Sequence, residues 1–152
     1  MIRNFICLFV LFVALPGQSF SFEDLAEKET KKLQGNWEIV SEEVDGKATP
    51  KQDFKNIRVS IKGDAYRTEV DGKTTAQGTW KFVKTEGKTV AVDEVTESTD
   101  PAVNGTTPAI YEWVNENSFR WCQHIDKGKR PTEFTAKKGS RQSIVEYRRI
   151  KR

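Results

Sequence analysis

The feature that most constrains the fold of this chain is a series of eight short segments rich in β-branched and aromatic residues. We predict strands at residues 37–44, 57–61, 65–70, 76–83, 89–95, 109–114, 118–124 and 143–150. Between several of them stand turn sequences typical of tight antiparallel hairpins, namely Gly63-Asp64, Asp71-Gly72, Glu86-Gly87 and Asn115-Glu116-Asn117. Eight such strands favour an all-β antiparallel meander that closes into a barrel, because closure removes the exposed sheet edges.

Alternation within the segments supports a sheet with two different faces. Ile57, Val59 and Ile61 share one face of their strand, and so do Gly78, Trp80 and Phe82 of another. An eight-stranded barrel has an interior that side chains can just fill or that can hold one small ligand. The pattern leaves both of these interiors open.

The N-terminal residues predict a secretory signal peptide over residues 1–21. A positive charge at Arg3 precedes an apolar run from Phe5 to Leu15, and Pro16-Gly17 ends that run. The run is short of the roughly 20 residues that span a bilayer, so we expect no transmembrane anchor. Cleavage after Ser21 leaves residues 22–152 as one exported domain, periplasmic or extracellular.

A short helix is predicted before the first strand, over residues 22–33. These residues are helix formers, and Gly35 is placed to stop the helix. Ser21 and Asp24 have the spacing of a capping box, which cleavage after Ser21 would remove.

The Gly35-x-Trp37 pair, after a helix and at the start of a strand, resembles the first motif of lipocalins. The resemblance implies that Trp37 closes one end of the barrel and that an arginine near the C-terminus stacks on its ring. An indole can seal the hole between strand ends, and a guanidinium can bind its face. Arg148 and Arg149 both remain candidates for that arginine.

Four blocks in order, LQGNWEIVSEEVDGK, IYEWVNENSFRWC, RPTEF and the terminal IKR, resemble an uncharacterised family of secreted lipocalin-like domains known mainly from planctomycetes. The resemblance implies a lipocalin-like fold and export, and it brings no ligand, activity or catalytic residue. The hairpin VNENS departs from the usual second lipocalin motif.

The RPTEF block suggests a latch that orders the long connection before the last strand. Pro131 stiffens it, Phe134 is expected to pack under the rim of the barrel, and Arg130 is placed to pair with Glu133.

Four aromatic residues are our candidates for ligand-binding residues in the barrel: Trp80, Tyr111, Trp113 and Trp121. If they face inward, they can line a pocket for a small apolar or amphipathic molecule. The opposite faces of the same hairpin carry Ile110, Val114 and Cys122, so the sequence leaves the inward face undecided, and core packing is the alternative reading.

No motif in the chain points to catalysis, a metal or a cofactor, and we expect none of these. Cys122 and His124 share a strand face and can form a nucleophile with its base or half of a metal site, but a buried structural cysteine is the simpler interpretation. The carboxylates of Glu42-Glu43 and Asp93-Glu94 split across two faces, although carboxylates from different strands can still meet.

Basic residues are concentrated in the last part of the chain. Residues 127–152 contain ten Lys or Arg and two Glu, while residues 22–126 carry a net charge of −6. Such a segment can bind an anionic envelope polymer or a protein partner, which is our alternative function for a barrel filled by side chains. It shows no motif for nucleic acid, and solvated surface charge is the simpler interpretation.

Overall fold

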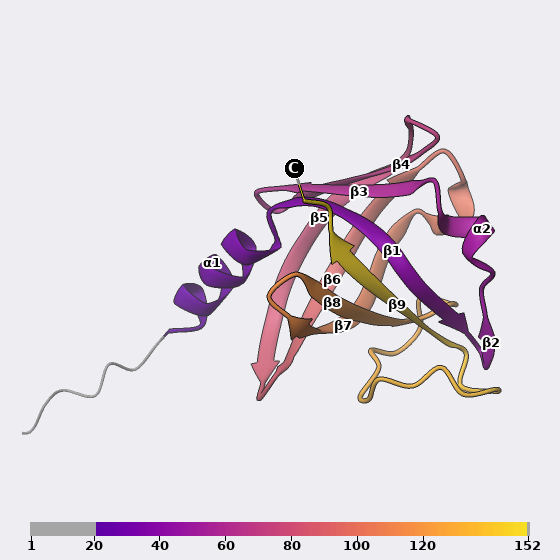
Figure 1. The fold of residues 1–152 in the computed structure, drawn as a ribbon. Helices are drawn as coiled ribbons and strands as arrows, with labels where there is room; N and C mark the ends of the chain where they lie inside the picture. The colour runs from indigo at the N-terminus through magenta and orange to yellow at the C-terminus, as the bar shows by residue number, and fades with distance from the viewer. Residues whose placement is uncertain (1–20, 152) are drawn as a thin grey trace, which may run out of the picture.

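The computed structural model describes residues 21–151, so the predicted signal peptide lies outside this range except for Ser21. Within these residues, nine strands and three helices follow one another (Figure 1). The strands are β1 (Gly35–Val44), β2 (Lys47–Ala48), β3 (Ile57–Lys62), β4 (Ala65–Val70), β5 (Lys73–Glu86), β6 (Thr89–Ser98), β7 (Gly105–Asn115), β8 (Ser118–His124) and β9 (Gln142–Arg149). The helices are α1 (Phe22–Leu33), α2 (Lys51–Phe54) and the 3-10 helix η1 (Pro101–Val103).

The strands form the predicted closed antiparallel meander. Each strand from β3 to β9 pairs with its neighbour in sequence, and β1 pairs with both β3 and β9. Closure is visible at Trp37, which lies opposite Val59 on one side and Arg149 on the other. The eight-stranded barrel is therefore confirmed, while the two-residue strand β2 and the short helices α2 and η1 were not predicted.

The pairing shifts register at four places, and each shift changes which residues face inward. One extra residue lies between Ile39 and Ser41 in β1, two lie in β5 at Thr75 and Val83, and one lies in β7 at Val114. An extra residue in one strand bends it and reverses the alternation beyond that point. In β1, Trp37 is buried and Ile39 lines the barrel interior before the shift, whereas Glu42 lines it after the shift.

Helix α1 lies at one end of the barrel beside the first residues of β1 (Figure 1). Ser21 caps it as the spacing predicted: its Oγ accepts from the Asp24 N–H at 3.2 Å, and its own N–H donates to Asp24 Oδ2 at 3.0 Å. Within residues 21–151, none of the helices has the length and apolar content needed to cross a membrane.

Trp37 closes the barrel at the α1 end. Its side chain is fully buried, and its indole N–H donates to the Leu33 carbonyl at 2.9 Å. Arg149, rather than Arg148, lies over the ring, with its Cζ 4.2 Å from the ring centroid. Arg149 also donates to the carbonyls of Gln34 and Lys32, which ties the last strand to the end of α1.

Gly35 is required at this junction for two reasons. Its φ of +123° is rarely adopted by residues with a side chain, and a Cβ there would lie 2.9 Å from an Arg149 guanidinium nitrogen. The Gly35-x-Trp37 pair is thus explained by one arrangement, in which the glycine leaves room for the arginine that covers the tryptophan.

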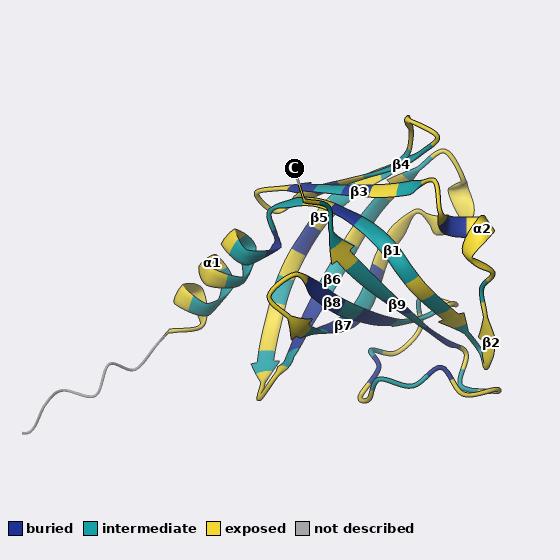
Figure 2. Cartoon of the chain, in the orientation of Figure 1, coloured by how far each residue is buried: buried dark blue, intermediate teal, exposed yellow. Residues whose placement is uncertain are grey.

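The main core lies inside the barrel, and burial follows the inner strand faces (Figure 2). The hairpin of β7 and β8 turns Tyr111, Phe119 and Trp121 inward, which decides the face that the sequence left open. On the opposite face, Ile110 and Cys122 are buried in a second cluster with Ala91, against which Phe134 and Ile144 pack.

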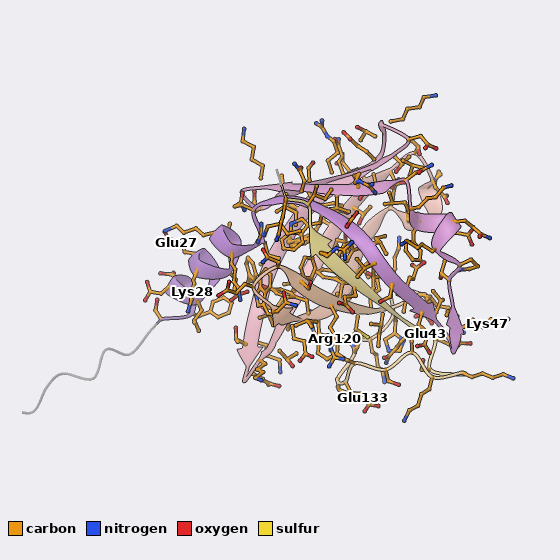
Figure 3. The ribbon with its side chains drawn as sticks, viewed as in Figure 1. Glu27, Lys28, Glu43, Lys47, Arg120 and Glu133 are labelled. Carbon is orange, nitrogen blue, oxygen red and sulfur yellow. The ribbon has the colours of Figure 1, made fainter. Side chains whose placement is uncertain are left out.

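The connection between β8 and β9, residues 125–141, covers this second cluster on the outside of the barrel. Arg120 of β8 lies over the Phe134 ring at 4.5 Å, and Figure 3 labels Arg120 and Glu133 on this side. The predicted pair of Arg130 and Glu133 is wrong: Arg130 instead pairs with Asp93 at 2.5 Å and donates to the carbonyls of Val92 and Ala109. The latch therefore holds strands β6 and β7. An arginine can donate to several acceptors at once, and Asp93 with the two carbonyls offers more acceptors than Glu133 alone.

Candidate functional site

A cavity of about 190 Å³ lies inside the barrel. It is lined by Ile39, Glu42, Val59, Tyr66, Thr68, Trp80, Glu94, Phe119, Trp121, Gln123, Ser143, Val145 and Tyr147. These residues come from β1, β3, β4, β5, β6, β8 and β9, so the cavity exists only when the barrel is closed. An apolar wall with a few polar groups that converge on one space is typical of a small-molecule site.

The lining changes from aromatic to polar along the barrel axis. Nearest the end that Trp37 closes, Phe119 lies opposite Tyr147, and their rings stack with centroids 4.9 Å apart. The next pair along β8 and β9 is Trp121 with Val145, and the pair after it is Gln123 with Ser143. Any molecule in the cavity would therefore meet rings at one end and hydrogen-bonding groups at the other.

Glu94 is the central polar group of the cavity. It lies directly opposite Trp80 in the pairing of β5 and β6, and burial raises the pKa of its carboxyl above the usual range. The donors of Tyr66 and Trp80 and the charge of Lys127 oppose this shift without cancelling it. Among residues 21–151, no Lys or Arg forms an ion pair with Glu94.

A second carboxylate, Glu42 of β1, lines the same cavity. The pKa of the Tyr147 hydroxyl is raised mainly by its burial, and the carboxylates of Glu94 and Glu42 raise it further. The two carboxylates therefore share the cavity with Tyr147, although the three residues are far apart in sequence.

One donor in the cavity wall, which lies near the Glu94 carboxyl, has no well-formed hydrogen bond. Trp80 is 9% exposed, and its indole N–H is buried with no hydrogen-bond acceptor in suitable geometry within the described residues. Tyr66, by contrast, has its hydroxyl hydrogen-bonded to Thr96 Oγ1 at 2.6 Å. A buried donor without a well-formed hydrogen bond is unusual in a folded protein, and a further acceptor in the cavity can satisfy it.

The structure separates the four predicted ligand-binding residues into two pairs. Trp80 and Trp121 line the cavity, and their ring centroids are 5.1 Å apart. Tyr111 and Trp113 belong to the closed end and are not among the cavity-lining residues. Their side chains both donate to Glu29 Oε2 of α1, at 2.7 and 2.6 Å.

Sequence reasoning missed Glu42 and Glu94 as cavity residues. For Glu94 a signal existed, because it shares the strand face of Val90 and Val92, which are buried in the core. For Glu42 simple alternation from Trp37 points outward, and only the register shift in β1 turns it inward. The two carboxylates belong to different strands, which is the arrangement that the sequence left open.

Cys122 and His124 do not contact each other directly. The Cys122 thiol lies in the outer cluster and donates to Gln142 Oε1 at 3.5 Å, while the Gln142 amide nitrogen lies 3.3 Å from His124 Nε2. Burial raises the pKa of Cys122 to about 11, which opposes formation of the nucleophilic thiolate. No group of three or more His, Cys, Asp or Glu residues within 21–151 is placed to hold a metal ion.

Several residues of the basic C-terminal segment are already bound within the chain. Arg130 pairs with Asp93, Arg141 with Asp126, and Arg148 with Glu38. Lys129, Lys137 and Lys138 are exposed on the connection between β8 and β9, and none of them takes part in an ion pair within the described residues.

Comparison of the chain with protein-family models, with curated proteins and with solved structures found no match. The closed eight-stranded meander is consistent with a lipocalin-like fold on its own geometry. The cavity and its lining residues are therefore the basis for any functional conclusion.

Proposed function

We propose that this protein is an exported, lipocalin-like binding protein, rather than an enzyme, and that it holds one small molecule inside the barrel. The observation that carries the proposal is the cavity of about 190 Å³, whose walls combine stacked rings with polar side chains. An engineered apolar cavity of about 150 Å³ is known to take up benzene, so this cavity has room for a molecule of about one ring.

The composition of the wall favours an amphipathic ligand over a purely apolar one. Phe119, Trp121 and Tyr147 offer apolar surface, and Gln123 and Ser143 offer hydrogen bonds beside them. A purely apolar molecule would leave the polar groups without partners, which costs binding free energy. Trp80 and Trp121 are the predicted ligand-binding residues that this proposal keeps.

Export and family membership are part of the same proposal. The support is the order of charge, apolar run and small residues over 1–21, together with the four sequence blocks that resemble secreted planctomycete domains. The mass of the exported protein tests this step, because cleavage after Ser21 leaves a chain that begins at Phe22. A chain that retains residues 1–21 after export would contradict it.

Native mass spectrometry tests the binding function. The protein is expressed with its predicted signal, purified gently from the exported fraction, and measured under native and then denaturing conditions. We expect a stoichiometric small molecule that is lost on denaturation. Trp121→Phe should reduce its occupancy, whereas Trp113→Phe, which changes a ring at the helix contact, should leave occupancy unchanged in folded protein. Equal occupancy in wild type and Trp121→Phe would contradict the cavity as the site.

We also propose a second interaction, with an anionic envelope polymer or an acidic protein partner. The exposed Lys129, Lys137 and Lys138 support it. We expect retention of the protein on an anionic support, weakened by moderate salt and by neutralising Lys137, Lys138 and Arg141 together. Unchanged retention of that variant would rule this interaction out.

A further inference from the structure

The two carboxylates of the cavity have no counter-charge inside the barrel. Glu42 lies in β1 and Glu94 in β6, and neither forms an ion pair with a Lys or Arg among residues 21–151. Among the described residues, Lys127 is the base whose charge reaches Glu94, and its ammonium donates to the Asn104 carbonyl. Two carboxylates in a partly dry space repel anions and favour a cation between them.

The other groups that face these carboxylates cannot neutralise them. Tyr66 of β4 and Tyr147 of β9 are the titratable neighbours, and burial raises the pKa of both hydroxyls. Thr68, Gln123 and Ser143 complete the polar lining and carry no charge. The cavity therefore presents hydrogen-bond acceptors and no positively charged side chain from residues 21–151, so a cation that pairs with Glu94 would come from a ligand.

A metal ion fits this site poorly. The described residues offer no third His, Cys, Asp or Glu beside the two carboxylates. A hard cation such as Ca²⁺ takes six to eight oxygen ligands, which exceeds what two side chains supply. A metal ion would also leave the aromatic side chains that line the cavity without a ligand to contact.

The rings favour an organic cation. Trp80 lies between Tyr66 and Trp121, with ring centroids 5.8 and 5.1 Å away. Aromatic faces attract ammonium groups and also bury the apolar body that carries them. The Trp80 N–H lies near Glu94 without a well-formed hydrogen bond, so it can also donate to a polar atom on that body.

We propose that the barrel binds a small primary amine in its protonated form, with the ammonium between Glu94 and Glu42 and a single ring against Trp80 and Trp121. The proposal rests on the binding function proposed above and names the chemical class of its ligand. Single-ring amines of the arylalkyl type match both the cavity volume of about 190 Å³ and its division into a polar and an aromatic end.

Binding of the amine changes the number of protons bound to the protein, so the proposal predicts a pH dependence of the affinity. A protonated Glu94 must release its proton to pair with the ammonium, so binding expels a proton wherever free Glu94 is protonated. Affinity for the amine should rise with pH until the carboxyl is ionised in the free barrel, and it should fall once the amine loses its own proton. A neutral ligand of the same shape should show no such rise.

The test uses three probes of one shape: phenethylamine, 2-phenylethanol and phenylacetate. Binding to the exported protein is followed by calorimetry and by tryptophan fluorescence, since Trp80 and Trp121 line the site. We expect phenethylamine to bind at least tenfold more tightly than the alcohol and phenylacetate to bind most weakly. Glu94→Gln should weaken the amine at least tenfold and leave the alcohol within about twofold.

Glu43→Gln is the matched control, because Glu43 is the exposed neighbour of Glu42 in β1 and is labelled in Figure 3 near β2. It should bind all three probes as the wild type does. Unfolding midpoints of all variants are measured first, so that loss of binding is read only from folded protein.

Equal affinity for amine and alcohol, or full amine affinity in Glu94→Gln, would overturn the amine proposal and spare the binding function. If the molecule found in native mass spectra contains no amine, that result would likewise overturn the amine proposal and spare the binding function. Absence of amine binding would also overturn the amine proposal. If the native mass spectrum then shows only the protein without a bound molecule, that result would count against the binding function too.

Discussion

Arg148 and Arg149 are neighbours in β9, but they act on opposite sides of the barrel wall. Arg149 covers the Trp37 ring and donates to two carbonyls at the end of α1. Arg148 pairs with Glu38 on the surface, where its side chain is 60% exposed. Strand alternation makes this difference, since adjacent residues point to opposite faces.

Arg149→Ala should therefore destabilise the protein by about 2 kcal/mol, because both a cation–π contact and charge-assisted hydrogen bonds are lost. Arg148→Ala should change the free energy of unfolding by less than about 1 kcal/mol, as is usual for an exposed ion pair. Guanidinium denaturation of both variants measures the difference. Equal losses would mean that Arg149 does not cover the barrel end.

Cys122 should be inert in the folded protein. Its thiol is fully buried beneath residues 133–135, and its pKa of about 11 leaves little thiolate at pH 8. We expect no reaction with an aromatic disulfide reagent until guanidinium unfolds the chain, and then one equivalent for a chain of residues 22–152. Cys122→Ser is the control. Fast labelling of native protein would mean that the connection between β8 and β9 opens.

At the scale of elements, helix α1 is attached to the barrel through a few directed contacts. Glu29 accepts from the Tyr111 hydroxyl and the Trp113 indole, and the Lys32 ammonium lies 3.9 Å from the Trp113 ring centroid. Leu33 is the one residue of α1 that is buried. The helix has little apolar surface of its own, so its position depends on these polar contacts.

Glu29→Ala should reduce stability by about 1–3 kcal/mol, because two ring donors at the closed end lose their acceptor. Glu27→Ala is the matched control on the same helix: Glu27 pairs with Lys31 in solvent, and its loss should cost no more than about 0.5 kcal/mol. Thermal unfolding compares the two variants. A Glu29→Ala protein as stable as Glu27→Ala would show that α1 docks without this carboxylate.

At the scale of the whole molecule, Glu94 links stability to pH. Burial raises its pKa in the folded state above the ordinary value of about 4.3, so the folded protein binds the proton more tightly than the unfolded chain. This contribution to stability is fully present below the unfolded pKa and is lost as pH rises through the folded pKa.

Glu94→Gln should therefore gain stability relative to the wild type as pH rises from about 4.3 toward the folded pKa of Glu94. Urea denaturation at a series of pH values measures the difference, with Glu43→Gln as the control for loss of an exposed carboxylate. A difference that does not change with pH would show that Glu94 is not desolvated in the closed barrel.

Local patterns were enough to predict the eight strands of the barrel and the helix α1. The predicted helix over 22–33 has the observed bounds, and Asp71-Gly72 forms the expected tight turn between Val70 and Lys73. The short elements β2, α2 and η1 were missed, because segments of two to four residues carry no resolvable period. The cavity was missed in part, because Glu42 reaches it only through a register shift.

The sequence by itself determined a meander of eight strands that begins with a helix and a Gly-x-Trp junction, since turn chemistry and side-chain alternation act between near neighbours. Only the tertiary structure decided that Arg149 covers Trp37, that Arg130 binds Asp93, and that Glu42 and Glu94 share one cavity with Trp80 and Trp121. These contacts join residues that are distant in the chain. Their positions depend on bulges and on barrel closure, which no local pattern specifies.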